Sequence, residues 1–213
     1  MILALFFIGS YLIGSFPSGY VIAKLFSGID IHSIGTTQIG AANVTRQLGK
    51  TFGALSLSLD LLKGLIPMTI VYYAFNQPMW VTSICGILTV FGHDFSIFMG
   101  FKGGEGLTTS MAVLFFISPS RFFLFAPFAI LSVYLTDYVT IGGIVQFWGY
   151  GVACWTTGEP MAAVYSTISL VTLALIKQIP WVLKNPPSQF MNPSFLASQT
   201  DPVASVEKII ENH

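Results

Sequence analysis

The charged residues of this chain are spaced so unevenly that they leave several long stretches without any charge. The chain has 213 residues, and Asp, Glu, Lys and Arg together make up 8% of it, where soluble domains have about 25%. A helix needs about 20 apolar residues to cross the hydrocarbon core of a bilayer. The uncharged stretches reach or approach this length, which identifies an integral membrane protein. They are residues 1–23, 64–92, 138–158 and 160–176, and two shorter ones, 106–120 and 122–136, on either side of Arg121.

We expect these stretches to be α-helices, because a lipid-exposed backbone must satisfy its hydrogen bonds internally and the sequence lacks the alternation of a membrane β-barrel. The chain is therefore predicted to be an all-α, polytopic membrane bundle with seven transmembrane helices in one membrane-embedded domain, residues 1–184. If the two shortest stretches form a re-entrant hairpin, five helices remain. The predicted helices are 2–25, 52–75, 79–99, 107–120, 122–137, 139–157 and 160–177. Residues 185–213 turn polar and rich in proline, which predicts a cytoplasmic tail.

The basic residues predict the orientation of the bundle. With seven helices, six basic residues fall on one side and Arg121 alone falls on the other, so the first side is cytoplasmic. The N-terminus is then outside and the C-terminus cytoplasmic. We expect the first stretch to be retained, because it lacks a charged n-region and a small-residue cleavage site. The six residues are Lys24, Arg46, Lys50, Lys102, Lys177 and Lys184.

The composition argues against several kinds of partner. The nine positive and nine negative charges cancel, so no bulk charge attracts nucleic acid, and an anion site must come from local clustering. Cys85 and Cys154 lie in apolar stretches and are predicted to be packed side chains. The histidines, His32, His93 and His213, are too scattered for a zinc site. We therefore expect no metal and no cofactor.

The first loop that stands out for its glycines ends at Arg46. Gly35 and Gly40 permit positive φ angles and a close approach of the backbone to a ligand, so that N–H groups can converge on an anion. The planar guanidinium of Arg46 matches phosphate oxygens. The pattern predicts a phosphate cradle, while a plain connection with a helix starting near Ala41 remains an equal alternative. Side-chain donors in the loop are Thr36, Thr37, Gln38 and Asn43.

The second such loop runs from Gly92 to Thr109, immediately before an apolar stretch. Lys102 followed by several glycines at a helix start favours an anion, because free N–H groups and the positive end of the helix dipole point outward there. The spacing is not that of a Walker A loop. The alternative is a flexible loop whose lysine marks the membrane interface. His93 and Asp94 are candidates for general base chemistry or for interfacial hydrogen bonding.

Asp60 and Lys63 lie three residues apart within an otherwise apolar region. Unpaired charges there would be costly in lipid. We predict a structural ion pair facing the bundle, in preference to a direct role in substrate binding.

These motifs resemble those of the bacterial acyl-phosphate:glycerol-3-phosphate acyltransferases, the PlsY family. The family pattern has Gly-Ser-Gly-Asn-x-Gly-Ala-x-Asn-x-x-Arg, then Asp-x-x-Lys-Gly, then Gly-His-x-Phe-Pro…Phe-Lys-Gly-Gly-Lys-Gly. The matching segments here are 35–46, 60–64 and 92–106, and the resemblance extends over residues 14–109. Residues 138–142 are similar to a further Tyr-Val-Ser-Leu segment.

The resemblance implies an enzyme of the bacterial inner membrane that moves a fatty acyl group from acyl phosphate to the 1-hydroxyl of glycerol 3-phosphate. The products are lysophosphatidic acid and phosphate, in the first step of phospholipid synthesis. Such an enzyme positions two phosphates and uses neither a covalent nucleophile nor a cofactor. The acyl chain would lie between helices, and the oligomeric state stays open, a monomer included. The residues implied to bind substrate or phosphate are Gly35, Thr36, Gly40, Ala41, Asn43, Arg46, His93, Lys102, Gly103, Gly104, Gly106 and Thr140.

The chain departs from the family pattern at several positions. Thr37 replaces a glycine, and its β-branch disfavours a positive φ angle. Glu105 replaces a lysine, a reversal worth several kcal/mol at an effective dielectric constant of about 20 and a distance of about 4 Å. His32 replaces an arginine, and the last motif, His-x-x-Asn-x-x-Arg-Leu, is absent from 178–184. Two alternatives therefore stay open: a non-catalytic paralogue that binds glycerol 3-phosphate or phosphate, and a small organic-anion transporter.

Overall fold

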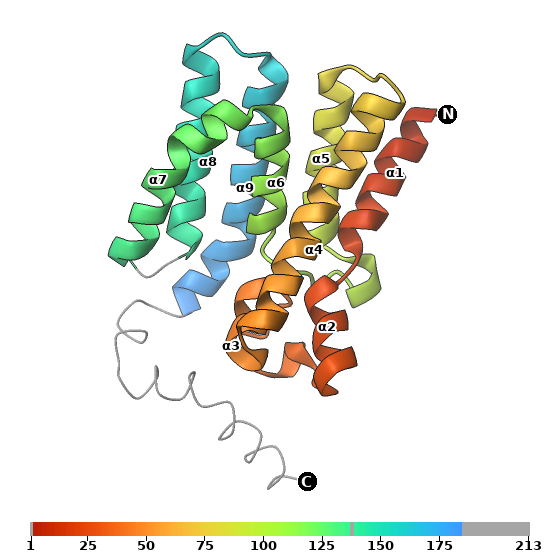
Figure 1. Ribbon diagram of the computed structural model, residues 1–213, viewed down its shortest axis with the longest axis vertical. Helices are drawn as coiled ribbons and strands as arrows, with labels where there is room; N and C mark the ends of the chain where they lie inside the picture. Colours follow the sequence, from red (N-terminus) through yellow and green to blue (C-terminus); the bar gives the residue numbers. More distant parts are fainter. Residues whose placement is uncertain (1, 137–138, 185–213) are drawn as a thin grey trace, which may run out of the picture. The chain divides into compact units, whose positions relative to one another are not determined.

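The computed structural model describes residues 2–136 and 139–184, with side chains over 2–136 and 141–177, and every regular element in these ranges is helical (Figure 1). The all-α prediction is thus confirmed for this part of the chain. The predicted tail, 185–213, and the side chain of Thr140 lie outside the described residues. The α-helices are α1 (Ile2–Ser15), α2 (Ser18–Ser27), α3 (Ala41–Leu48), α4 (Lys50–Thr69), α5 (Met79–Asp94), α6 (Leu107–Ile117), α7 (Pro119–Thr136), α8 (Val139–Thr156) and α9 (Met161–Lys184).

Within the described residues, four helical segments are long and apolar enough to cross a membrane. They are Ile2–Ser27, Lys50–Ala74, Met79–Met99 and Pro119–Thr136, and two shorter apolar helices are Leu107–Ile117 and Met161–Lys177. Large apolar side chains such as Phe123, Ile130 and Leu135 of α7 are exposed on the surface. This exposure fits a protein whose solvent is lipid.

The first predicted helix, 2–25, is wrong in one respect, because the chain leaves the helical conformation at Phe16 and Pro17. Proline has no N–H to continue a helix and restricts the residue before it, so a break here is expected from local sterics. The carbonyl oxygen of Phe16 accepts a hydrogen bond from Nζ of Lys63, 3.2 Å away. A cation from α4 thus satisfies a carbonyl group that the break leaves without a helical partner.

The described residues divide into two compact units, residues 2–16 with 60–136 and 139–178, and residues 17–59 with 179–184. In the first unit, α1 lies alongside α5 (Figure 1). Their backbones touch at two glycines: a Cβ atom on Gly14 would lie 2.0 Å from the carbonyl oxygen of Thr89, and one on Gly92 would lie 2.2 Å from that of Tyr11. Small residues at a helix interface allow such an approach.

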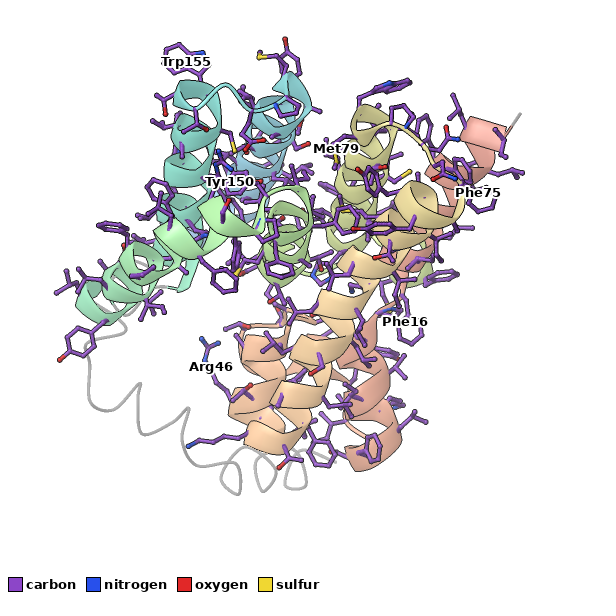
Figure 2. The ribbon with its side chains drawn as sticks, turned by 45° about the horizontal axis from the view of Figure 1, so that its top comes forward. Phe16, Arg46, Phe75, Met79, Tyr150 and Trp155 are labelled. Atoms are coloured by element: carbon purple, nitrogen blue, oxygen red, sulfur yellow. The ribbon has the colours of Figure 1, made fainter. Side chains whose placement is uncertain are left out.

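The core of the first unit lies among α6, α8 and α9. Phe147 and Tyr150 of α8 are buried there together with Leu114 and Leu170, and Figure 2 shows Tyr150 within the unit while Trp155 points outward at the end of α8. Cys154 belongs to the same core, and both cysteines of the chain are free and buried. This confirms that they are packed side chains.

In the second unit, α2 is followed by a single 3-10 turn, Ile31–Ser33, and then by α3. The helix predicted to start near Ala41 is confirmed. Gly19 of α2 allows the loop to pack closely, since a Cβ atom there would lie 2.0 Å from the carbonyl oxygen of Ile39. The loop that precedes α3 is therefore held against α2 by backbone contact.

Candidate functional site

The side chain of Asn43 lies at the centre of the first glycine loop. It is buried, and its Nδ2 group donates to the carbonyl oxygens of Gln38 (2.9 Å), Ile34 (3.2 Å) and Ile31 (3.4 Å). Its Oδ1 accepts a hydrogen bond from the N–H of Thr36 at 3.2 Å. The amide that the sequence offered as a phosphate donor is thus used to fold the loop.

Two residues of this loop, Gly35 and Thr37, have left-handed backbone conformations. Gly35 has φ +60° and Thr37 has φ +58°. Glycine is also required at 35 for space, because a Cβ atom there would lie 2.3 Å from Oδ1 of Asn43. Thr37 adopts a conformation that costs an L-residue about 1–2 kcal/mol. The loop therefore has the positive φ that the β-branch at 37 was expected to disfavour.

The end of this loop presents an exposed cation. Arg46 lies in the last turn of α3, and Figure 2 shows its side chain extending away from the helix. Among the described residues it has no ion-pair partner. Gly40 precedes the first turn of α3 and leaves open space, since a Cβ atom on it would meet nothing within 4 Å. Ala41, the first residue of α3, is buried.

The second glycine loop belongs to the first unit. Two of its backbone N–H groups, which we predicted to face an anion, donate instead to carbonyl oxygens of the protein. The N–H of Gly103 donates to the carbonyl oxygen of Asp94 at 3.1 Å, and the N–H of Gly104 donates to that of His93 at 3.0 Å. Glycine at 104 is required for packing, because a Cβ atom there would lie 2.2 Å from Nε2 of His93. Lys102 is exposed. Within the described residues of this loop, Lys102 is the cation open to a ligand.

The start of α6, where we predicted a bound anion, lies beside a carboxyl group of the protein itself. Gly106 is the N-cap of α6 with φ +66°, and a Cβ atom on it would lie 2.4 Å from Oδ1 of Asp94. An external anion at the start of α6 would have to bind beside this buried side chain.

The predicted ion pair of α4 is confirmed. Nζ of Lys63 lies 2.8 Å from Oδ1 of Asp60, and both side chains are buried. Nδ1 of His93 lies 3.7 Å from the same oxygen, and the hydroxyl of Thr109 donates to the carbonyl oxygen of Asp60 at 3.2 Å. His93 is therefore part of a buried charged cluster that joins α4, α5 and α6.

Lys177 has a structural role that sequence reasoning missed. Its Nζ donates to the carbonyl oxygen of Asp94 at 2.7 Å and lies 4.8 Å from the ring centroid of Phe95. The only local signal is a lysine at the end of an apolar stretch.

Among the described residues, no group of three or more His, Cys, Asp or Glu is placed to hold a metal ion.

Comparison with known proteins places this geometry in a family. A family model described as glycerol-3-phosphate acyltransferase matches residues 4–184. The chain belongs to the glycerol-3-phosphate acyltransferase family. It is 38% identical over 169 residues to the family member of Aquifex aeolicus, which covers 79% of this chain and 87% of that protein. It is 37% identical over 159 residues to glycerol-3-phosphate acyltransferase 2 of Thermotoga maritima, which covers 72% of this chain and 81% of that protein.

The same family appears among solved structures. The chain is similar to PlsY (YgiH), an integral membrane glycerol 3-phosphate acyltransferase, in its glycerol 3-phosphate form, with a TM-score of 0.76 and 34% identity over 86% of this chain and 92% of that chain. The lysophosphatidic acid form of that enzyme gives a TM-score of 0.75 at 34% identity, with 86% of this chain and 91% of that chain covered. These likenesses confirm the predicted family and show that this family member is a multi-pass membrane protein.

Proposed function

We propose that this protein transfers a fatty acyl group from acyl phosphate to the 1-hydroxyl of glycerol 3-phosphate, giving lysophosphatidic acid and inorganic phosphate. The observation that carries the proposal is the likeness, over 86% of the chain, to an integral membrane acyltransferase solved in its glycerol 3-phosphate form. Both reactants carry a phosphate group. The protein must therefore bind two anions beside an apolar acyl chain.

The reaction needs orientation and charge neutralisation more than it needs a nucleophile on the protein. The hydroxyl oxygen of glycerol 3-phosphate attacks the acyl carbonyl carbon, the bond from that carbon to the phosphate oxygen breaks, and inorganic phosphate leaves with the electron pair. The hydroxyl proton passes to the phosphate of glycerol 3-phosphate. Holding the two reactants in line and neutralising the charge on the leaving phosphate supply the rate.

Arg46 and Lys102 are the residues to which we assign the phosphate groups. Both are exposed cations, one in each compact unit, and a charge-assisted hydrogen bond to phosphate contributes about 1.5–3 kcal/mol. We assign direct contacts with substrate also to residues that the family resemblance implies. These are Gly35, Thr36, Gly40 and Ala41, which precede Arg46 in the chain, Gly106, which follows Lys102, and Thr140. Asn43, Gly103, Gly104 and His93 shape the two loops instead, since their polar groups contact the protein.

We also propose how the chain crosses the membrane. Seven helices, drawn from α1 with α2 and from α4 to α9, would span a bacterial inner membrane over residues 1–184. The N-terminus would be outside and residues 185–213 would form a cytoplasmic tail. The supporting observation is the sequence bias of basic residues, six of which fall on one side of such an arrangement while Arg121 falls on the other. Phosphate substrates would then bind from the cytoplasm.

The test is acyl transfer by the purified protein. With acyl phosphate and glycerol 3-phosphate, we expect lysophosphatidic acid and phosphate in equal amounts. Arg46→Ala and Lys102→Ala should each lower kcat/KM about tenfold or more, the loss of one charge-assisted hydrogen bond. Lys24→Ala is the matched control, because this lysine is exposed and its Nζ donates to the carbonyl oxygen of Gly28 rather than to a residue of either glycine loop. Equal activity in all three variants would contradict the assignment of the two cations.

A second candidate function is binding without turnover. Glu105 lies in the loop where the family pattern has lysine, next to the Gly106 that packs on the Asp94 carboxylate. Two carboxylates near the start of α6 favour a relative that binds glycerol 3-phosphate weakly and does not transfer an acyl group. Calorimetric binding of glycerol 3-phosphate with no lysophosphatidic acid formed would establish this candidate and exclude the first.

A further inference from the structure

One backbone carbonyl joins α9 to the second glycine loop. The carbonyl oxygen of Asp94, the last residue of α5, accepts hydrogen bonds from Nζ of Lys177 at 2.7 Å and from the N–H of Gly103 at 3.1 Å. The ammonium of Lys177 also lies 4.8 Å from the ring centroid of Phe95. A hydrogen bond and a cation–π contact thus hold the ammonium of Lys177 in place. It shares its acceptor, the carbonyl oxygen of Asp94, with the N–H of Gly103, the residue after Lys102.

The same lysine lies near two carboxyl groups, those of Asp94 and Glu105. The Asp94 side chain is fully buried, and among the described residues neither of its carboxylate oxygens has a hydrogen-bond partner. Glu105 lies in the adjoining loop, between two glycines that pack on His93 and Asp94. The ammonium of Lys177 interacts electrostatically with both carboxylates, and Lys63 adds a further positive charge near Asp94.

We propose that Lys177 is a positioning residue for acyl transfer, which keeps the loop of residues 102–106 competent to bind a phosphate group. Its charge offsets that of Glu105, and its hydrogen bond holds the carbonyl group of Asp94, which also accepts from the N–H of Gly103. Without Lys177, the Glu105 carboxylate would repel an incoming phosphate and attract the ammonium of Lys102 away from the substrate. The inference rests on the proposed function and adds a residue that the family motifs quoted above do not contain.

The experiment measures kcat and KM for both substrates in Lys177→Met, Glu105→Gln and the double variant. Methionine keeps the length and apolar packing of the lysine stem and removes the charge. We expect Lys177→Met to raise KM for at least one phosphate substrate about tenfold. Adding Glu105→Gln should recover about threefold or more of that loss, because the carboxylate that opposes the phosphate is gone. Lys177→Arg, which keeps the charge, should stay within about threefold of the unmodified protein.

The controls separate positioning from folding. A merely structural role would lower the amount of active protein, so kcat would fall at unchanged KM and Glu105→Gln would not restore it. That result, or independent multiplicative effects of the two substitutions, would overturn the inference while the proposed function stands. Lys24→Met should behave as the unmodified protein. If the unmodified protein itself forms no lysophosphatidic acid, the proposed function fails first and the inference falls with it.

Discussion

The strained residue Thr37 offers a direct test of the loop geometry. Its φ of +58° costs an L-residue about 1–2 kcal/mol. Thr37→Gly removes this strain but adds about 0.5–1 kcal/mol of chain entropy to the unfolded state. Because Thr37 is exposed, little packing is lost. The two backbone contacts of the residue, its N–H to the carbonyl oxygen of Ile34 (3.0 Å) and its own carbonyl oxygen 3.2 Å from Nδ1 of His32, remain in the variant.

The net gain from Thr37→Gly is therefore up to about 1.5 kcal/mol, which corresponds to a rise in Tm of up to about 6 °C for a chain of this size. Thermal unfolding in detergent measures it. Thr37→Ala is the matched control, because it removes the same side-chain atoms beyond Cβ and keeps the strain of a left-handed L-residue. Thr36→Gly, at a neighbour without positive φ, should lower Tm. The reasoning is refuted if Thr37→Gly unfolds at or below the temperature of Thr37→Ala.

Three further substitutions test the buried polar contacts. Asn43→Asp should lower the free energy of unfolding by about 1–3 kcal/mol, because a carboxylate cannot donate to the three carbonyl oxygens that the amide now satisfies; chemical or thermal denaturation measures it. Lys63→Met should destabilise by about 3–5 kcal/mol, since it removes one partner of a buried ion pair and leaves the other partner, Asp60, in place; the loss is again measured by unfolding. Gly104→Ala should lower both Tm and acyl transfer, because the new methyl group displaces the imidazole of His93.

Lys63→Met and Gly104→Ala each have a control variant that isolates the cause. Asp60→Asn combined with Lys63→Met removes both charges and should cost less than Lys63→Met alone; a larger cost would contradict the ion-pair argument. Gly9→Ala, in open space within α1, should leave Tm unchanged or raise it, whereas a loss equal to that of Gly104→Ala would show that any added methyl group is harmful. An unchanged unfolding curve for Asn43→Asp would mean that the amide does not hold the loop.

The helices could be predicted from the sequence because the bilayer dictates their length. The predicted helix 79–99 coincides with α5 and the short turn that ends at Met99, and the predicted 52–75 coincides with the continuous helical segment Lys50–Ala74. The break at Pro17 was missed, since the apolar pattern runs through it without interruption. Pro67 and Pro127 lie inside helices that continue. A proline in an apolar stretch is therefore an ambiguous signal.

The candidate site could be predicted only in part. Arg46 and Lys102 could be proposed as phosphate ligands from the sequence, because a cation beside glycines is a local pattern. The role of Asn43 depends on three carbonyl groups that come together only in the folded loop. The contact between Lys177 and Asp94 joins residues 83 positions apart, so no local pattern could indicate it. Local residue types reveal what can bind an anion, while the tertiary contacts decide which groups are still free to do so.

The backbone contact between α1 and α5 has a consequence for biogenesis. The hydroxyl of Tyr11 reaches the carbonyl oxygen of Phe95, 84 positions later in the chain. At about 5–20 residues per second, the ribosome needs roughly 4 to 17 s to make the partner surface. During that interval α5 does not yet cover the surface of α1 around Gly14, Ser10 and Ser15, which is buried in the folded protein. Lipid or the insertion machinery must cover it instead.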